Sequence, residues 1–242
     1  MKRSSSNDRS WPKYLVAGDQ GLVVEFGSRI DPDINAKVQS LHRSLARHPI
    51  PGVIETVPTF RSLLVWYDPL LIGFDELVGR IQTIKSTPPE VWRAKPPLII
   101  PTVYGGEFGP DIDFVARHNR ISVDEVIALH VSASYVVYMI GFTPGFPYLG
   151  GLPKTLATPR LHVPRTLVPA GSVGIAGEQT GVYPVESPGG WRLIGRTPLK
   201  LYDPAREDPV LLEPGDLVRF HRIDEAEFRE WDKRERTSAG TE

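Results

Sequence analysis

The sequence predicts an α+β protein of two domains, with an α+β domain over residues 13–91 and a barrel or sandwich of short strands over residues 92–225. A chain of 242 residues is long enough for two domains that each bury a core. Helix-period and strand-period patterns alternate in the first part, whereas glycine and proline separate many short apolar runs in the second. Residues 1–12 and 226–242 are expected to be tails.

The first domain opens with a half-buried strand and a capped helix. Leu22, Val24 and Phe26 alternate as they do when one face of a strand is buried. Asp31 offers an N-cap oxygen, and Pro32 occupies the first helical position, where its missing N–H costs nothing. The apolar stripe of this helix recurs at helical spacing and consists of Ile34, Val38, Leu41 and Leu45.

Two β-rich runs and a second helix complete this domain. Residues 53–57 and 62–67 predict strands. The second helix is marked by Phe74, Leu77, Ile81 and Ile84 and is expected to end before Pro88 and Pro89. The proline-punctuated run KPPLIIP, residues 95–101, then changes the character of the sequence, so we place the domain boundary near residue 92.

The second domain is expected to begin with two short helices and to continue as strands. One helix follows Pro110, and Ser122 with Glu125 three residues later forms the pattern of a capping box at the start of the other. The predicted strands cover residues 135–140, 172–176, 191–194 and 217–223. Behind them, Phe228 and Trp231 favour a short helix before a frayed end.

Composition excludes several classes of function. Twenty-eight basic and 29 acidic residues leave almost no net charge, which argues against nucleic acid as a partner. The absence of cysteine excludes disulfides, thiolate nucleophiles and Cys-ligated metal. The sequence contains neither a signal-peptide pattern nor a run of about 18 apolar residues. We therefore expect a cytoplasmic protein with no membrane contact.

The residues that indicate function lie between Gly141 and Pro198. Glycine and proline at this density predict loops rather than strand interiors, and such loops let a ligand or partner approach the main chain. Aromatic and forked cationic side chains in this segment suit a small planar or carboxylated ligand: Phe142, Phe146, Tyr148, Tyr183, Trp191, Arg160, Arg165, Arg192 and Arg196. The alternatives are that the aromatics fill the core and that the arginines are solvated.

Other chemistry receives less support from the sequence. His130 and His162 are candidate acids or bases, but neither has a ligand at metal-binding spacing, so no metal site is expected. Ser172 in AGSVG resembles a hydrolase nucleophile only superficially, because Ala170 replaces the first glycine of that motif and a strand continues after the serine. No nucleotide-binding motif is present.

Several long motifs in order resemble the family of 5-oxoprolinase B subunits. In this second domain they are YGGEFGPDI, IGFTPGFPYLGGL, VPAGSVGIAG, QTGVYP, SPGGW and IGRTP, and GDQGLVVEFG and GVIETVPTFRSLLVWYDP extend the resemblance to the first domain. Members of this family are also known as allophanate hydrolase subunit 1 or as the Kip inhibitor of a histidine kinase. The resemblance covers residues 15–223 and implies an N-terminal α+β domain followed by a cyclophilin-like β-barrel.

The resemblance also implies partners, a cofactor and an activity. Together with an A and a C subunit, such proteins open 5-oxoproline to glutamate at the expense of ATP, and the turn-rich surface would line a cleft at the boundary with the C subunit. We expect the turns at residues 171–177 and 187–190 to shape the site. Opening a lactam requires stabilisation of a developing oxyanion, which arginines and main-chain N–H groups provide.

We assign candidate roles on this basis. His130 is the candidate proton carrier, and Arg165, with Arg160 and Arg196, is expected to bind a carboxylate or the oxyanion. The expected substrate-binding residues are Phe142, Phe146, Arg160, Gln179, Tyr183, Trp191 and Arg196. The competing hypotheses are a regulatory protein that binds a histidine kinase, a component of an allophanate- or urea-processing enzyme and, on fold alone, a prolyl isomerase.

Overall fold

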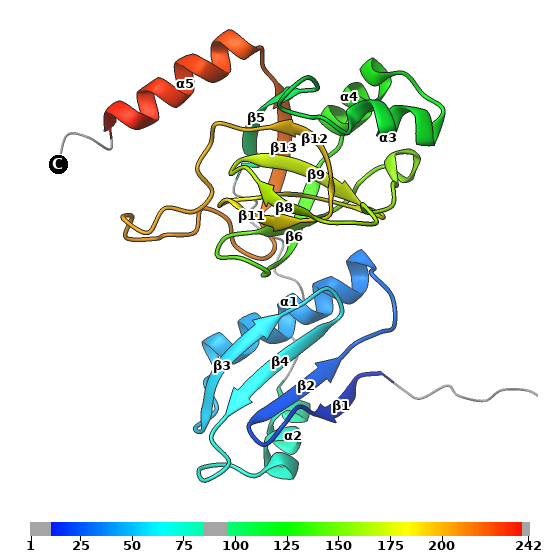
Figure 1. The fold of residues 1–242 in the computed structure, drawn as a ribbon. Coiled ribbons are helices and arrows are strands. Elements are labelled where there is room, and N and C mark those ends of the chain that lie inside the picture. The colour runs from blue at the N-terminus through cyan, green and yellow to red at the C-terminus, as the bar shows by residue number, and fades with distance from the viewer. Residues whose placement is uncertain (1–10, 85–95, 239–242) are drawn as a thin grey trace, which may run out of the picture. The chain divides into compact units, whose positions relative to one another are not determined.

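The computed structural model describes residues 11–84 and 96–238, and the chain divides into two compact units, residues 1–93 and 94–242 (Figure 1). The α+β fold class predicted from the sequence is confirmed, because the first unit combines a sheet with helices and the second contains a closed barrel. The boundary predicted near residue 92, together with Pro88 and Pro89, lies outside the described residues.

The first unit is a four-stranded antiparallel sheet with two helices. Its strands follow the order β1 (Lys13–Val16), β2 (Gly21–Glu25), β4 (Ser62–Tyr67) and β3 (Val53–Pro58), and its helices are α1 (Pro32–Arg47) and α2 (Phe74–Thr83). Asp31 caps α1 as predicted, since its carboxylate accepts from the N–H groups of Asp33 and Ile34. One core joins sheet and helices and includes Leu22, Val24, Leu63, Val65, Val38, Leu45, Leu77 and Ile81.

The second unit contains a closed seven-stranded barrel within residues 96–238 (Figure 1). Around the barrel the strands are β10 (Gln179–Val182), β7 (Pro147–Gly150), β6 (Tyr135–Ile140), β13 (Leu217–Arg222), β5 (Leu98–Tyr104), β12 (Arg192–Arg196) and β9 (Ser172–Ala176). A separate two-stranded ribbon pairs β11 (Ser187–Gly189) with β8 (Arg165–Val168). The remaining elements are α3 (Ile112–Asn119), α4 (Val123–Ser132), the 3-10 turn η1 (Lys154–Leu156) and α5 (Glu225–Ser238).

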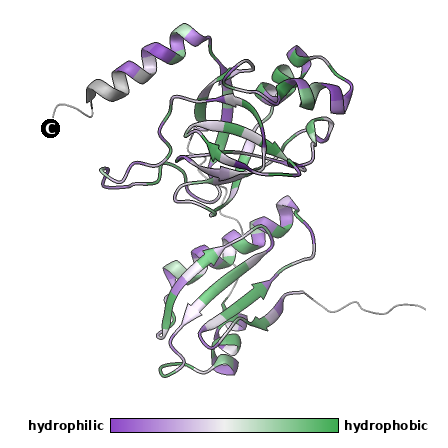
Figure 2. Ribbon diagram, in the orientation of Figure 1, coloured by the Kyte–Doolittle hydropathy of each residue, from purple (hydrophilic) through white to green (hydrophobic). Residues whose placement is uncertain are grey.

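The helices of this unit confirm their sequence signals. Ser122 and Glu125 form the capping box of α4, with the Ser122 N–H donating to Glu125 Oε2 at 2.7 Å and the Glu125 N–H donating to Ser122 Oγ at 3.2 Å. Val115 from α3 and Val126 from α4 lie in the same buried cluster as the barrel interior. Phe228 of α5 packs on Phe108 at 4.9 Å between ring centroids. The part of α5 that is coloured in Figure 2 is mostly hydrophilic. None of the helices in the described part of the chain could cross a membrane.

The barrel strand β5 was not expected, because its sequence contains a proline. β5 runs parallel to β13 from Leu98 to Thr102 and pairs with β12 only at Val103 and Tyr104. Pro101 therefore lies where β5 has β13 but not β12 as a hydrogen-bonding neighbour. A proline is tolerated at such a position, since its missing N–H removes no bond from a ladder.

The prediction that glycine and proline keep residues 141–198 out of strand interiors is wrong. Besides β9 and β12, which match the strands predicted at residues 172–176 and 191–194, this segment forms β7, β8, β10 and β11. Glycine occupies strand positions where large aromatic side chains lie against the backbone. A Cβ on Gly181 would lie 2.8 Å from Pro147 O and 3.1 Å from both Phe146 Cζ and Trp191 Cζ3. A Cβ on Gly174 would sit 3.0 Å from Trp191 Cβ. These glycines leave room for large rings on the strands.

Gly181→Ala tests this packing. The added methyl group meets main chain and two buried rings, so the variant should lose about 1–3 kcal/mol of stability. Gly79→Ala is the matched control, because Gly79 lies in α2 with no atom within 4 Å of its added Cβ, and it should gain about 0.5–1 kcal/mol. Thermal unfolding of the two variants and the wild type measures both changes, and a Gly181→Ala protein as stable as the wild type would contradict the packing argument.

Candidate functional site

Five rings from separate parts of the second unit form an aromatic cluster, which consists of Phe142, Phe146, Tyr148, Tyr183 and Trp191. Phe146 lies at its centre, with ring centroids 5.1 Å from Tyr183, 5.3 Å from Trp191, 4.9 Å from Tyr148 and 5.6 Å from Phe142. All four contacts are edge-to-face, the arrangement that aromatic quadrupoles favour. The fold thus brings together the aromatic residues that the sequence singled out.

Burial divides the aromatic cluster into an inner and an outer part. Phe146, Tyr183 and Trp191 are buried and share a core cluster with Val168, Ala176 and Leu193. Tyr148 is half-buried, and Phe142 exposes 61% of its surface. Burial raises the pKa of the Tyr148 and Tyr183 hydroxyls, so both stay protonated at neutral pH. We call the three buried rings, Phe146, Tyr183 and Trp191, the floor of the cluster. Phe142 is the most exposed ring and the one that a ligand can reach.

Arg160 is the exposed cation beside the aromatic cluster. Its guanidinium carbon lies 5.8 Å from the centroid of the Trp191 ring. Its charge also opposes the rise in the pKa of Tyr148 and Tyr183, which places the guanidinium within electrostatic reach of both hydroxyls. Among the side chains that the structure describes, no carboxylate forms an ion pair with Arg160. Its charge is therefore available to an anion.

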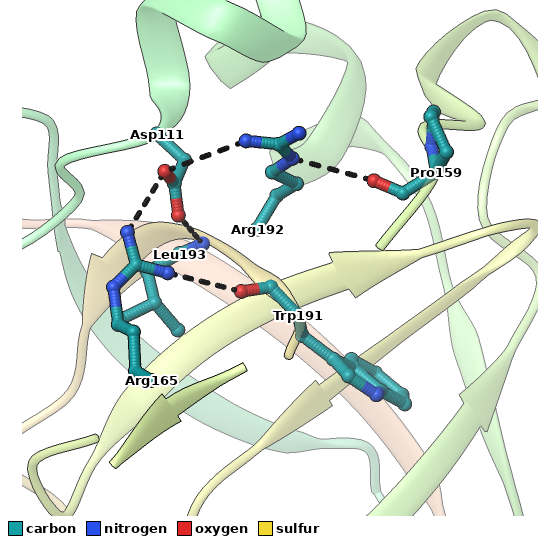
Figure 3. A network of polar contacts seen from close by, with 6 residues as sticks. All are labelled: Asp111, Pro159, Arg165, Trp191, Arg192 and Leu193. Carbon is teal, nitrogen blue, oxygen red and sulfur yellow. Dashed lines mark hydrogen bonds and ion pairs between the residues drawn. The ribbon is translucent and has the colours of Figure 1, made fainter. Parts of the chain in front are cut away.

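Arg165 and Arg192, in contrast, share the carboxylate of Asp111 (Figure 3). Arg165 Nη2 lies 2.9 Å from Asp111 Oδ1, and Arg192 Nη1 lies 3.9 Å from the same oxygen. Asp111 Oδ2 accepts from the Leu193 N–H at 2.7 Å. Because Arg165 also reaches Trp191 O at 3.5 Å, this network ties α3, β8 and β12 together next to Trp191 of the aromatic cluster.

The sequence analysis did not single out Asp111. It directly follows Pro110 in the YGGEFGPDI motif, where a carboxylate before a helix is ordinarily taken for a cap. Here its side chain makes no capping bond to α3 and binds the strand and the arginines instead. Arg192 is held further by stacking on Phe114, at 3.6 Å from its centroid, and by donating to Pro159 O.

Arg196 and Gln179 each bury a side-chain nitrogen that has no partner in the described residues. Arg196 ends β12 with its guanidinium carbon 5.7 Å from the Phe108 ring, outside the aromatic cluster, and burial lowers its pKa while Glu107 opposes that effect. Its Nε and the Nε2 of Gln179 are buried with no hydrogen-bond partner in the described residues. The substrate-binding roles predicted for both residues stay predictions.

His130 is buried within a polar chain in the second unit. Tyr104 Oη lies 2.8 Å from its Nδ1, and Thr180 Oγ1 lies 3.1 Å from its Nε2. Thr180 donates to Gly174 O, so its oxygen accepts from Nε2–H and Nδ1 accepts from Tyr104. Burial lowers the pKa of His130 to about 3, and the ring is neutral. His130 connects α4 to the strands under Trp191, and the proton-carrier role stays a prediction.

The structure also shows where Ser172 and His162 lie. Ser172 begins β9, which leads into a hairpin with β10 and not into a helix, so the context of a hydrolase nucleophile is absent around it. His162 is exposed in the turn before β8. Among the described residues no group of three or more His, Asp or Glu side chains is arranged to hold a metal ion.

Comparison with known proteins gives consistent matches. Residues 12–212 match the family described as the carboxyltransferase domain, subdomain C and D. The 5-oxoprolinase B subunit of Bacillus subtilis (strain 168) is 43% identical over 87% of this chain and 92% of its own length, and that of Escherichia coli O157:H7 is 44% identical over 86% and 94%. A urea amidolyase of Lachancea kluyveri is 27% identical, and this chain covers 13% of it. The crystal structure of TTHA0988 matches with a TM-score of 0.76 and 38% identity over 85% of this chain and 40% of that one.

The buried state of His130 predicts a loss of stability in acid. Its pKa falls from an ordinary 6.5 to about 3 on folding, so between these values the unfolded chain binds a proton that the folded one excludes. The contribution of neutral His130 to the free energy of unfolding is therefore fully present above about pH 6.5. Below that pH it falls by up to about 1.4 kcal/mol per pH unit. Unfolding measured from pH 7.5 to 4.5 should show a shallower decline for His130→Gln than for the wild type. His118→Gln, at an exposed position, should keep the wild-type decline, and equal slopes for all three proteins would contradict the assignment.

Proposed function

Because this chain belongs to the family of 5-oxoprolinase B subunits, we propose that it is the B subunit of an ATP-dependent enzyme that opens 5-oxoproline to glutamate. The observation that carries this proposal is identity of 43–44% to two such subunits over more than nine tenths of their length. The urea amidolyase is a more distant relative, at 27% identity, so a urea- or allophanate-processing role has less support. We place the protein in the cytoplasm, where ATP is available.

The enzyme requires partner subunits. The region similar to this chain makes up 40% of TTHA0988, so in that protein it is joined to a further stretch of polypeptide. We propose that an A and a C subunit supply the equivalent parts here and that this chain alone is inactive. ATP belongs to a partner in this scheme, since the sequence carries no phosphate-binding loop.

The reaction breaks the lactam C–N bond, adds the oxygen of water to the carbonyl carbon and leaves a proton on the nitrogen. Negative charge develops on the amide oxygen, and preorganised donors stabilise it best where water is excluded. In our proposal this chain presents the substrate to groups of the partners. The outer part of the aromatic cluster receives the lactam ring, and Arg160 pairs with the carboxylate.

Arg165 and His130 are positioning residues in this proposal. Arg165 neutralises Asp111 and holds the main chain at Trp191, while His130 links Tyr104 to Thr180 in β10. Their loss would disturb the floor of the site. Arg196 remains a second candidate for the oxyanion, because its Nε has no partner in the described residues.

Reconstitution tests the proposal. The chain is combined with the A and C subunits encoded in the same genome, and glutamate release from 5-oxoproline is followed with and without ATP. ATP-dependent release that needs all three subunits supports the proposal. If the mixture releases no glutamate and the chain instead blocks autophosphorylation of a histidine kinase, the protein is a regulator and the proposal fails.

Arg160→Gln should weaken substrate binding specifically. Loss of a charge-assisted contact to the carboxylate is expected to raise KM for 5-oxoproline about tenfold. Competitive inhibition by pyrrolidinone, the same lactam without its carboxyl group, should not change. Arg219→Gln, at an exposed arginine of β13, is the matched control and should behave as the wild type. An unchanged KM for Arg160→Gln would remove Arg160 from the site.

A further inference from the structure

Phe142 has a backbone conformation that L-residues avoid. Its φ is 69°, and among the described residues Arg120, with φ of 59°, is the other non-glycine residue with positive φ. Arg120 ends α3, and its N–H donates to Ala116 O and Arg117 O, so its conformation follows from helix termination. Phe142 ends no helix.

The conformation of Phe142 is imposed by a tight turn. The Thr143 N–H donates to Gly141 O at 2.9 Å, which closes a three-residue γ-turn centred on Phe142. A γ-turn with positive φ at its centre is the rare and strained form. Gly141 and Phe146 bracket it with a further bond, from the Gly141 N–H to Phe146 O at 3.1 Å. The loop is therefore fixed at both ends while its central residue is strained.

Burial does not explain why phenylalanine occupies this position. Phe142 exposes 61% of its surface and touches the aromatic cluster only edge-on, at 5.6 Å from Phe146 and 6.3 Å from Tyr183. Glycine would adopt the same turn without strain. Strained residues that contribute little to the core are concentrated at sites of function. The strain thus holds an apolar ring in solvent at the edge of the aromatic cluster.

The second feature of the aromatic cluster is Arg160, whose charge has no carboxylate partner among the described side chains and whose guanidinium carbon lies 5.8 Å from the centroid of the Trp191 ring. Phe142 and Arg160 are both exposed, and they contact two different buried rings of this cluster, Phe146 and Trp191 respectively. An apolar ring and a cation in one cluster suit a small ligand that is flat in one part and anionic in another. A carboxylated lactam has both properties, since its amide is planar and packs on an aromatic face.

We propose that the γ-turn at Phe142 presents its ring as the wall of the substrate site and that Phe142 determines the affinity for the lactam ring. This inference rests on the function proposed above and gives Phe142, one of the expected substrate-binding residues, a contribution to binding that is separable from its effect on folding. The ring provides affinity, and the strained turn costs stability.

Two variants at the same position separate these effects. Phe142→Ala and Phe142→Gly both remove the ring, but only glycine relieves the strain. The melting temperature of the glycine variant should exceed that of the alanine variant by about 2–4 °C. In the reconstituted complex both should raise KM for 5-oxoproline about tenfold, with a smaller change in kcat, and both should weaken inhibition by pyrrolidinone to the same extent.

Arg120 provides the matched control. Arg120→Gly should likewise melt at a higher temperature than Arg120→Ala, because the same left-handed backbone is relieved. Both variants should keep the wild-type KM, since Arg120 is an exposed residue at the end of α3. A change in KM confined to position 142 then assigns the effect to the ring and not to relief of strain.

Three results would overturn the proposal. A KM within about twofold of the wild type for both Phe142 variants excludes the ring from the substrate site. Failure of these variants to assemble with the partner subunits, seen by size-exclusion chromatography, makes Phe142 an assembly contact instead. A wild-type complex that leaves 5-oxoproline intact contradicts the proposed function and this inference with it, whereas the first two results leave the proposed function standing.

Discussion

The packing of aromatic rings onto glycine positions of the barrel strands is the constraint on which the rest of this structure depends. Phe146 and Trp191 lie against Gly181, and Trp191 also lies against Gly174. A methyl group on either glycine would come too close to these side chains. The rings are large and rigid, and the backbone beneath them is fixed by strand pairing between β9 and β10. The site proposed here is therefore built on a floor that cannot shift without disrupting the barrel.

Two polar networks hold the strands that carry these rings. Asp111 links Arg165 and Arg192 to the main chain of Leu193, and His130 links Tyr104 to Thr180. Each joins a helix or loop to barrel strands, and a buried polar network is rigid only while every member has its partner. The division of the arginines follows from this, because the Asp111 carboxylate neutralises Arg165 and Arg192, whereas Arg160 has no such carboxylate within the described ranges and can attract an anion.

The sequence predicts much of this fold, and its failures have physical causes. The capped helix at Asp31, the capping box at Ser122 and the strands at residues 135–140 and 172–176 follow from local patterns and are confirmed. β5 was not predicted because Pro101 is unusual in a strand. β10 was not predicted because Gly181 is typical of a loop, and only the structure shows that aromatic rings pack against it. Local rules fail where tertiary packing selects the residue.

The candidate site was predictable in composition but not in organisation. The aromatic residues between Phe142 and Trp191 do meet, as their density in one segment suggested. Which of them is exposed, which arginine is free of a carboxylate in the described structure and which backbone is strained depend on contacts between distant residues, such as that of Asp111 with Arg165. Asp111 lies 54 positions from Arg165, and no local pattern joins them.

A structure of the assembled enzyme with 5-oxoproline bound tests the central claim most directly. The account predicts that the lactam ring lies within about 4 Å of the Phe142 ring and that its carboxylate lies about 3 Å from the guanidinium of Arg160. A substrate bound wholly within a partner, with the aromatic cluster covered by protein, would contradict it.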